Sequence, residues 1–365
     1  FNWIFALPHP ELDANCFSVA WTGSVIMPKT MDGCIGLSTQ DSMRLYVDDK
    51  LLIDGWGKDK SADQALDFHF EAGRTYKIRI EFVNDRRGAR VIFGYSAGWE
   101  NFPAAVEAAR KADVAILCMG DNEETSGENF DRTDLNLPGR QLELVQAVYA
   151  TGTPVVLVLQ SGRPVTANWE NDHLPAILEA WFPGEQGGTA IAKTLFGDAA
   201  PGGRLPITFP RSVGQIPCHY SRRPGGGKRY VEMDWLPLYP FGYGLTYTTF
   251  AYRDMALSRS VIDPQDTVTV SVTVTNTGKY TGDAVPQLYV RDMFSSVVKP
   301  ERQLAAFRRL TLAPGESRRV ELTVGPKPLR TLGSDYVWRV EPGKFELQLG
   351  DNAENILLRA DLTVE

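Results

Sequence analysis

A cluster of acidic side chains follows an apolar run in the middle of the chain and offers the first chemistry in this sequence. The run DVAILCM, residues 113–119, is typical of a buried strand, and the loop after it ends at Gly139. Like charges repel, so this crowding lowers stability unless the loop is solvated, paired with cations or used for chemistry. The acids are Asp121, Glu123, Glu124, Glu128, Asp131 and Asp134.

Glu128 is the acid in this loop with the best prospect of chemistry. We expect Asp131 and Arg132 to form an ion pair that fixes the loop, which leaves Glu128 as the freer carboxyl group. Repulsion from the neighbouring acids would raise the pKa of Glu128, so that it could donate a proton near neutral pH. The alternative is that Glu128 is one more solvated acid on a surface loop.

The loop lies in a segment, residues 98–247, where apolar strands alternate with amphipathic helices. Strands are predicted at DVAILCMG, TPVVLVLQSG and AILEAWFPG, and helices at NFPAAVEAARKA, GRQLELVQAVYATG and EQGGTAIAKTLFGD. This alternation predicts a flavodoxin-like α/β sandwich, in which ligands bind at the carboxyl ends of the strands. The acidic loop starts at such an end and is longer than usual, so we expect it to project.

Both flanks of this segment predict β structure. Residues 1–97 contain short alternating runs, and YVDDKLLID predicts a hairpin with Asp48, Asp49 and Lys50 at its turn. Residues 248–365 hold runs such as TVTVSVTVTNTG, which predict an immunoglobulin-like or fibronectin type III-like sandwich. The predicted fold class is therefore mixed α/β and all-β, with three domains at residues 1–97, 98–247 and 248–365.

Several motifs in order resemble one known family. The string SGENFDRTDLNLPG is similar to the acid/base loop of glycoside hydrolase family 3, which includes β-glucosidases and β-xylosidases. Further similar motifs are PVVLVLQSGRPV, AWFPGEQGG, GDAAPGGRLPITFP and LYPFGYGLTYTTF. The first segment resembles the protective-antigen-type sandwich that some members insert into their α/β domain. The last segment is similar to the family's fibronectin type III-like domain.

The resemblance implies a retaining, exo-acting β-glycosidase, with a β-glucosidase favoured and a β-xylosidase or other glycosidase of the family as the alternative. It implies that Glu128 is the general acid/base and that the substrate is an oligosaccharide or β-glucoside. Two carboxyl groups are enough for this chemistry, so no cofactor and no metal are expected.

The nucleophile is the part of the family pattern that this sequence lacks. The resemblance places that aspartate in a Ser-Asp-Trp or similar motif of an N-terminal (β/α)8 barrel. The only Asp-Trp pair here is Asp234-Trp235, in a loop of another domain, so Asp234 is not expected to be the nucleophile. We therefore expect a C-terminal part that begins inside the inserted sandwich, needs a barrel polypeptide as partner and is inactive alone.

Weaker site candidates lie elsewhere in the chain. Trp181, Arg223 and Tyr230 are possible substrate contacts, although core packing is the favoured interpretation of Trp181 and a solvated loop explains the other two equally well. PGEQGG precedes a helix but lacks the Lys-Ser/Thr of a phosphate-binding loop, so nucleotide binding is not expected. Asp48 and Asp49 resemble the calcium-binding acids of some protective-antigen-type sandwiches, but turn acids need no metal.

Composition excludes several classes of function. The 365 residues carry a formal charge of −7 with scattered Lys and Arg, which does not suit nucleic acid. No apolar run reaches the ~18 residues of a membrane span. The cysteines are irregularly spaced, which disfavours zinc, and Cys118 is expected to be a buried free thiol. The sequence does not decide the cellular compartment, and a homo-oligomer is possible. The second hypothesis for the function is a non-catalytic carbohydrate-binding or adhesion protein.

Overall fold

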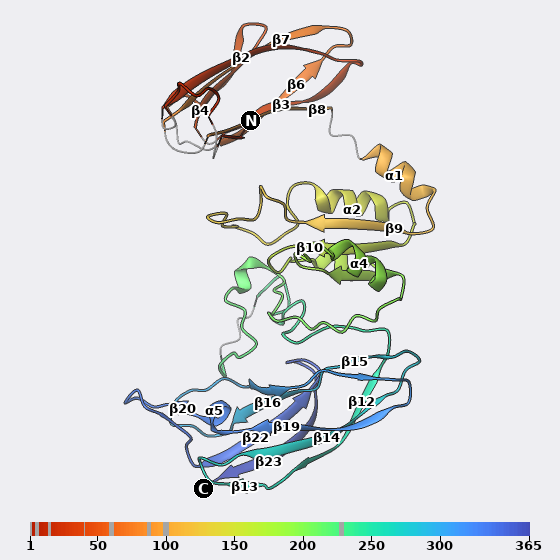
Figure 1. Cartoon of the computed structure of the whole chain (residues 1–365), viewed down its shortest axis with the longest axis vertical. Coiled ribbons are helices and arrows are strands. Elements are labelled where there is room, and N and C mark those ends of the chain that lie inside the picture. The colour runs from red at the N-terminus through yellow and green to blue at the C-terminus, as the bar shows by residue number, and fades with distance from the viewer. Residues whose placement is uncertain are drawn as a thin grey trace. The chain divides into compact units, whose positions relative to one another are not determined.

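The computed structural model divides the chain into two compact units, Phe1–Ala108 and Ala109–Glu365 (Figure 1). The predicted boundary after residue 97 falls beside residues 98–101, which lie outside the described part, and the three-domain division stays a prediction. The structure describes residues 2–3, 7–13, 16–39, 41–57, 62–85, 89–97, 102–225 and 230–365.

The first unit contains two antiparallel four-stranded sheets that enclose one apolar core. One sheet has the order β1 (Asn2–Trp3), β8 (Ala89–Ala97), β3 (Met31–Thr39) and β6 (Ala62–Phe70). The other has the order β2 (Phe17–Ile26), β7 (Thr75–Asn84), β4 (Ser42–Val47) and β5 (Lys50–Asp54). Alternating side chains such as Ile35, Leu45 and Phe82 face inward and are almost fully buried, as the period of two predicts.

The predicted hairpin of the first unit is confirmed. Asp48 and Asp49 join β4 to β5 with φ angles of 49° and 62°, the left-handed conformation that Asp tolerates better than most residues. The Asp48 carboxylate accepts hydrogen bonds from the Lys77 N–H at 2.9 Å and from Arg74 at 3.0 Å. The Lys77 N–H holds the pKa of Asp48 below its usual range. Both carboxylate oxygens therefore have protein donors.

The second unit begins with a parallel three-stranded sheet, which the alternation of strands and helices predicted. Its order is β11 (Ala176–Glu179), β10 (Val155–Gln160) and β9 (Ala115–Gly120). Figure 1 shows α2 and α4 alongside this sheet. Helix α1 (Pro103–Arg110) spans the boundary between the two units. The second unit continues with α2 (Gln141–Tyr149), α3 (Asn168–His173) and α4 (Gly187–Leu195), followed by a short 3-10 turn, η1 (Val213–Gln215).

The apolar run before the acidic loop is less buried than predicted. Cys118 is a free thiol, but it is exposed, and Ile116 on the same face is 44% exposed. The reason is that β9 lies at one edge of this sheet among the described strands, whereas Val155, Leu157 and Val158 of the central strand β10 are fully buried. The prediction of a buried Cys118 is therefore wrong.

The second unit ends in a sandwich of a three-stranded and a five-stranded sheet that share one core. Strand β14 shows the cleanest alternation, with Val268, Val270, Val272 and Val274 all buried. One sheet has the order β12 (Phe250–Leu257), β14 (Val268–Asn276) and β19 (Ser317–Val324). The other has the order β13 (Val261–Ile262), β23 (Ile356–Val364), β22 (Gly343–Gly350), β16 (Gln287–Asp292) and β17 (Gln303–Phe307).

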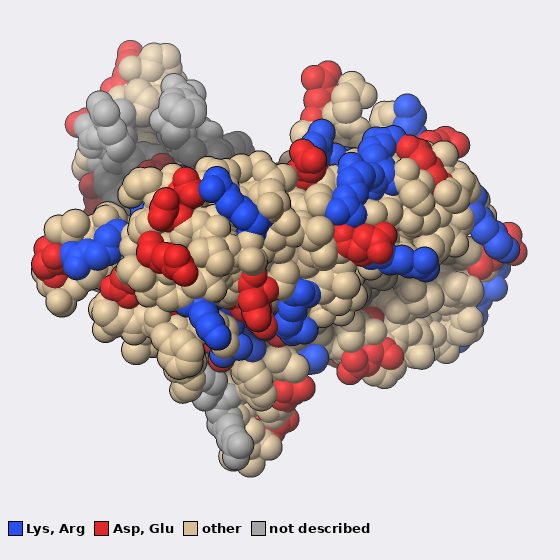
Figure 2. All heavy atoms as spheres, turned by 90° about the horizontal axis from the view of Figure 1, so that it is seen from below, with Lys and Arg blue, Asp and Glu red and all other residues tan. Residues whose placement is uncertain are grey.

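Two short strand pairs and a helical turn complete this sandwich. The elements are β15 (Gly282–Ala284) with β18 (Leu310–Leu312), β20 (Thr331–Leu332) with β21 (Trp338–Arg339), and α5 (Pro326–Leu329). Figure 2 shows acidic and basic side chains interspersed over the visible face. Arg309 and Arg318, for example, pair with Asp283 and Glu316. None of the described helices has the length and apolar character that a membrane span requires.

Candidate active site

The three parallel strands bring their following loops to one edge of the sheet. Gly120 at the end of β9 lies opposite Gln160 at the end of β10, and Leu159 lies opposite Glu179 at the end of β11. The acidic loop therefore emerges beside the turn Ser161–Arg163, and the residues that follow Glu179 leave the sheet at the same edge, on the other side of β10. This is the edge where parallel sheets collect ligand chemistry.

Gly120 allows the chain to leave β9 in a sharp turn. Its φ is 140°, and a Cβ atom added to it would lie 2.0 Å from the carbonyl oxygen of Gln160. The side chain of Gln141 fixes this turn, because its Oε1 accepts from the Gly120 N–H at 2.7 Å and its Nε2 donates to the Gly120 carbonyl at 2.8 Å. Asp121 is thereby directed into the base of the loop.

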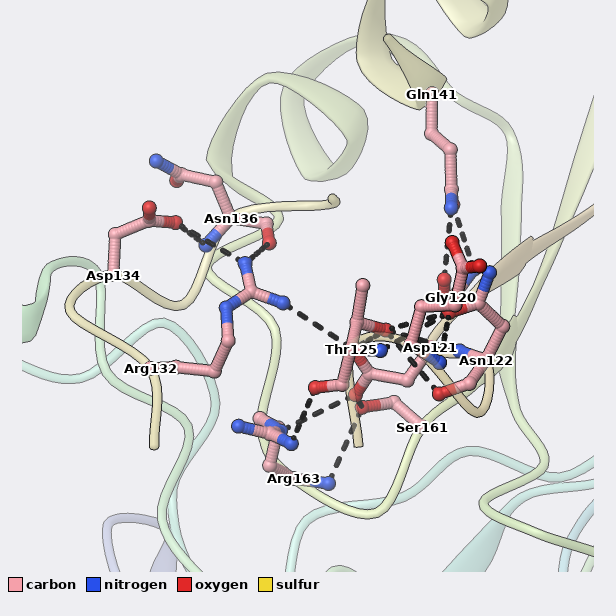
Figure 3. Close-up of polar contacts among 11 residues, drawn as sticks. Gly120, Asp121, Asn122, Thr125, Arg132, Asp134, Asn136, Gln141, Ser161 and Arg163 are labelled. Atoms are coloured by element: carbon pink, nitrogen blue, oxygen red, sulfur yellow. Dashed lines mark hydrogen bonds and ion pairs between the residues drawn. The ribbon is translucent and has the colours of Figure 1, made fainter. Parts of the chain in front are cut away.

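Asp121 is the centre of a polar network at the base of the loop (Figure 3). Its side chain is only 3% exposed. Oδ1 accepts from Thr125 Oγ1 at 3.0 Å and from Arg132 Nη1 at 3.3 Å. Oδ2 accepts from Ser161 Oγ at 2.7 Å and lies 3.2 Å from Arg163 Nε. Two guanidinium groups and two hydroxyl groups thus offset the desolvation of one buried carboxylate.

Arg132 does not pair with Asp131, so that prediction is wrong. The guanidinium of Arg132 turns inward to Asp121 and also lies 3.6 Å from Asp134, while Asp131 is exposed. A buried carboxylate attracts a cation more strongly than a solvated one, because water screens the exposed partner. Arg132 also donates to the Asn136 carbonyl at 3.3 Å, which ties it to the end of the loop.

Glu128 lies on the outer part of the loop and is exposed. In the part of the chain that the structure describes, its carboxylate has no hydrogen-bond or ion-pair partner. The next residue, Asn129, has a φ of 65°, so the backbone turns sharply at this point. Glu128 is also absent from the lining of the small cavity of about 10 Å³ around Asp121, Arg132 and Arg163. The carboxyl group can therefore be reached from outside the loop.

A second notable acid at this edge, Glu179, was missed from the sequence. Burial raises its pKa to about 7. Its Oε1 accepts from the Trp181 N–H at 3.0 Å, and among the described atoms its buried Oε2 has no partner. The only signal in the sequence is a glutamate near the end of an otherwise apolar strand, AILE. Asp121, Ser161 and Arg163 were likewise not singled out as a group.

The weaker site candidates occupy two different places. Trp181 is half-buried after β11 and packs edge-on against Phe209, with ring centroids 5.8 Å apart. Arg223 and Tyr230 instead line a hollow of about 370 Å³ with Trp235. The Tyr230 hydroxyl donates to the Gly214 carbonyl at 2.8 Å. None of the three residues lines the cavity beside Asp121.

The other sites considered from the sequence are a metal site, Asp234 and the turn before α4. No group of three or more His, Cys, Asp or Glu side chains suited to a metal ion occurs among the described residues. Asp234 caps its own turn, because its Oδ1 accepts from the Leu236 N–H at 3.0 Å. Residues 183–188 lead into α4, whose first residue, Gly187, packs so closely against Pro183 that a Cβ atom would lie 2.4 Å from the Pro183 ring.

The chain thus combines a parallel sheet, which has a long acidic loop at its carboxyl edge, with a β-sandwich, and comparisons with known proteins assign this combination to a family. Residues 18–247 match the model of the glycosyl hydrolase family 3 C-terminal domain, and residues 284–353 match a fibronectin type III-like domain. This chain belongs to glycoside hydrolase family 3.

Relatives of named activity support this membership over the whole chain. A β-xylosidase of Formosa agariphila is 45% identical over 80% of this chain, which covers 42% of that protein. A β-glucosidase of Rhizobium radiobacter is 34% identical over 100% of this chain and 48% of its own length. The crystal structure of a Kluyveromyces marxianus β-glucosidase in complex with glucose has a TM-score of 0.75 at 28% identity, covering 99% of this chain and 47% of that one. The chain thus spans less than half the length of these relatives.

Proposed function

We propose that this chain is the C-terminal part of a retaining, exo-acting β-glycosidase, and that it supplies the general acid/base. The favoured activity is the hydrolysis of terminal, non-reducing β-D-glucosyl residues of oligosaccharides or β-glucosides. The observation that carries the proposal is the position of Glu128. It is an accessible carboxyl group on a projecting loop that a buried ionic network anchors at the carboxyl edge of the sheet.

The proposed reaction has two steps, each with its proton accounted for. In the first, the Glu128 carboxylic acid gives its proton to the glycosidic oxygen while the C1–O bond breaks and an aspartate attacks C1. In the second, the Glu128 carboxylate takes a proton from water, whose oxygen bonds to C1 as the ester to the aspartate breaks. The aspartate belongs, in this proposal, to a (β/α)8 barrel that works as the partner of this chain.

A β-xylosidase is the second candidate, and one observation favours it. The relative at 45% identity is named a β-xylosidase, whereas the β-glucosidase that covers the whole chain is 34% identical. Xylose and glucose differ by the hydroxymethyl group at C5, so the choice depends on the residues around that group. Parallel assays with aryl β-glucosides and aryl β-xylosides decide between the two sugars.

The test of Glu128 is the dependence of rate on the leaving group, in an enzyme that holds this chain together with its barrel. Glu128→Gln should lower the rate of the first step by about 10²- to 10⁴-fold for aryl glycosides with poor leaving groups. Substrates whose leaving groups need no proton should lose much less. Glu143→Gln is the matched control. Glu143 lies on α2, pairs with Arg140 just before the helix, and has no part in the proposed chemistry.

Two outcomes would contradict the role of Glu128. One is an unchanged rate with poor leaving groups after Glu128→Gln. The other is an equal loss with good and poor leaving groups, since a missing proton donor must matter most where protonation is needed most.

A further inference from the structure

The loop segment that carries Glu128 is held at both ends by the same side chain. Thr125 lies three residues before Glu128 and Arg132 lies four residues after it, and both donate to Oδ1 of Asp121. The Thr125 carbonyl also accepts from Arg163 Nη2 at 3.0 Å, and Arg163 itself pairs with Oδ2 of Asp121. Figure 3 shows these groups converging on Asp121.

The loop around Glu128 also has backbone hydrogen bonds of its own. The Ser126 N–H donates to the Asn122 carbonyl at 3.0 Å, and the Phe130 N–H donates to the Gly127 carbonyl at 3.2 Å. The Phe130 ring packs on Gly127, where a Cβ atom would lie 3.1 Å from the ring. The tip therefore has a defined turn, and its orientation depends on where residues 125 and 132 are held.

The charge balance of the network depends on Asp121. The side chains of Arg132 and Arg163 are only 19% and 23% exposed, and both contact the Asp121 carboxylate. Without a negative charge at this position, two partly buried guanidinium groups repel each other at the base of the loop. Such repulsion would move the anchor points even where the rest of the chain stays folded.

We propose that Asp121 is a positioning residue, which acts through Thr125, Arg132 and Arg163 to hold Glu128 where it can protonate the leaving oxygen. This inference rests on the proposed function of Glu128. A general acid must come within hydrogen-bond reach of the atom that it protonates. A displacement of about 1 Å in a reacting group can lower a rate by roughly 10²-fold.

The variant that tests this proposal is Asp121→Asn, which keeps the size of the side chain and removes its charge. In the enzyme with its barrel, we expect kcat for poor leaving groups to fall by roughly 10- to 100-fold. For these substrates we expect KM to change little. For substrates with good leaving groups, we expect kcat/KM, which reports the first step, to fall much less, because their departure needs little proton donation. Circular dichroism and thermal unfolding show whether the variant is folded.

A second variant covers the case in which Asp121→Asn does not fold. Thr125→Val removes a half-buried hydroxyl group, which donates to Asp121 Oδ1 and also accepts from the Asn122 N–H at 3.0 Å, and it leaves the Asp121 carboxylate in place. It should give a smaller loss of kcat with the same dependence on the leaving group. Glu143→Gln again serves as the control for removal of an ion-paired acid outside the network.

The outcomes separate this inference from the proposed function. Suppose that Glu128→Gln shows the dependence on leaving group, but the folded variants at Asp121 and Thr125 lose no activity or lose it equally for all substrates. The positioning role is then overturned, and the acid/base role stands. If Glu128→Gln itself shows no such dependence, the proposed function fails first. A shared dependence in all three variants supports both.

Discussion

Replacing Glu179 with glutamine should change how the stability of the second unit depends on pH. Burial raises the pKa of this carboxyl group from its ordinary value of 4.5 to about 7 in the folded chain. Glutamine is always neutral, and its Oε1 can still accept from the Trp181 N–H that now contacts Glu179. The substitution therefore removes the ionisation and keeps the hydrogen bond.

The direction in which stability changes with pH follows from the higher pKa of this carboxyl group in the folded chain, which keeps the proton up to a higher pH. Below pH 4.5 the carboxyl group is protonated in both the folded and the unfolded chain, so the stability that depends on it is fully present. As the pH rises from 4.5 to about 7, the unfolded chain gives up its proton first and stability falls. Because one pKa unit corresponds to about 1.36 kcal/mol, the free energy of unfolding should fall by roughly 3 kcal/mol over this window.

The measurement is urea denaturation of the full chain at about pH 4.5 and about pH 8, for the wild type and for Glu179→Gln. Hydrogen exchange of the β10 amides assigns the change to this sheet. We expect the variant to match the wild type at the lower pH and to exceed it at the higher pH. Glu185→Gln, which changes an exposed acid in the next turn, is the matched control. Parallel pH dependences of the wild type and Glu179→Gln would refute the reasoning.

Two further predictions concern a close backbone contact and a buried hydrogen-bonding side chain in the second unit. Gly120→Ala should destabilise the chain by about 3 kcal/mol or more in urea denaturation, because a Cβ atom would lie 2.0 Å from the Gln160 carbonyl; a loss below 1 kcal/mol would contradict this. Asn276→Ala should cost about 2–4 kcal/mol in thermal unfolding, because the buried amide donates to the carbonyls of Tyr280 and Leu312. An unchanged Tm would show that water replaces these bonds.

Regular patterns predicted most of the fold, because they reflect which side chains avoid water. The alternation of TVTVSVTVTNTG matches the inward face of β14, and the apolar runs separated by helices match the parallel order of β9, β10 and β11. The burial of an edge strand could not be predicted from such patterns. The runs of β9 and β10 are both apolar, but β9 lies at an edge of the sheet and leaves Cys118 exposed. The local sequence does not show which strand lies at an edge.

The acidic loop shows where prediction from sequence stops. A loop has no period, so nothing in its sequence distinguishes the acid that points inward from those that face water. Asp121 has the same charge as Asp131, yet it is Asp121 that pairs with both Arg132 and Arg163, and Arg163 comes from a separate loop. Similarity to the family motif selected Glu128, whereas only the three-dimensional contacts show what holds the loop in place.

Chemical rescue tests the acid/base role of Glu128 most directly. With Glu128→Ala in the enzyme and an aryl β-glucoside that has a good leaving group, the first step should still form the glycosyl-enzyme intermediate. Added azide needs no general base to attack C1, so it should accelerate turnover and yield the β-glycosyl azide. The account predicts this product with Glu128→Ala and its absence with the wild type. No acceleration by azide and no glycosyl azide from a folded Glu128→Ala variant would contradict it.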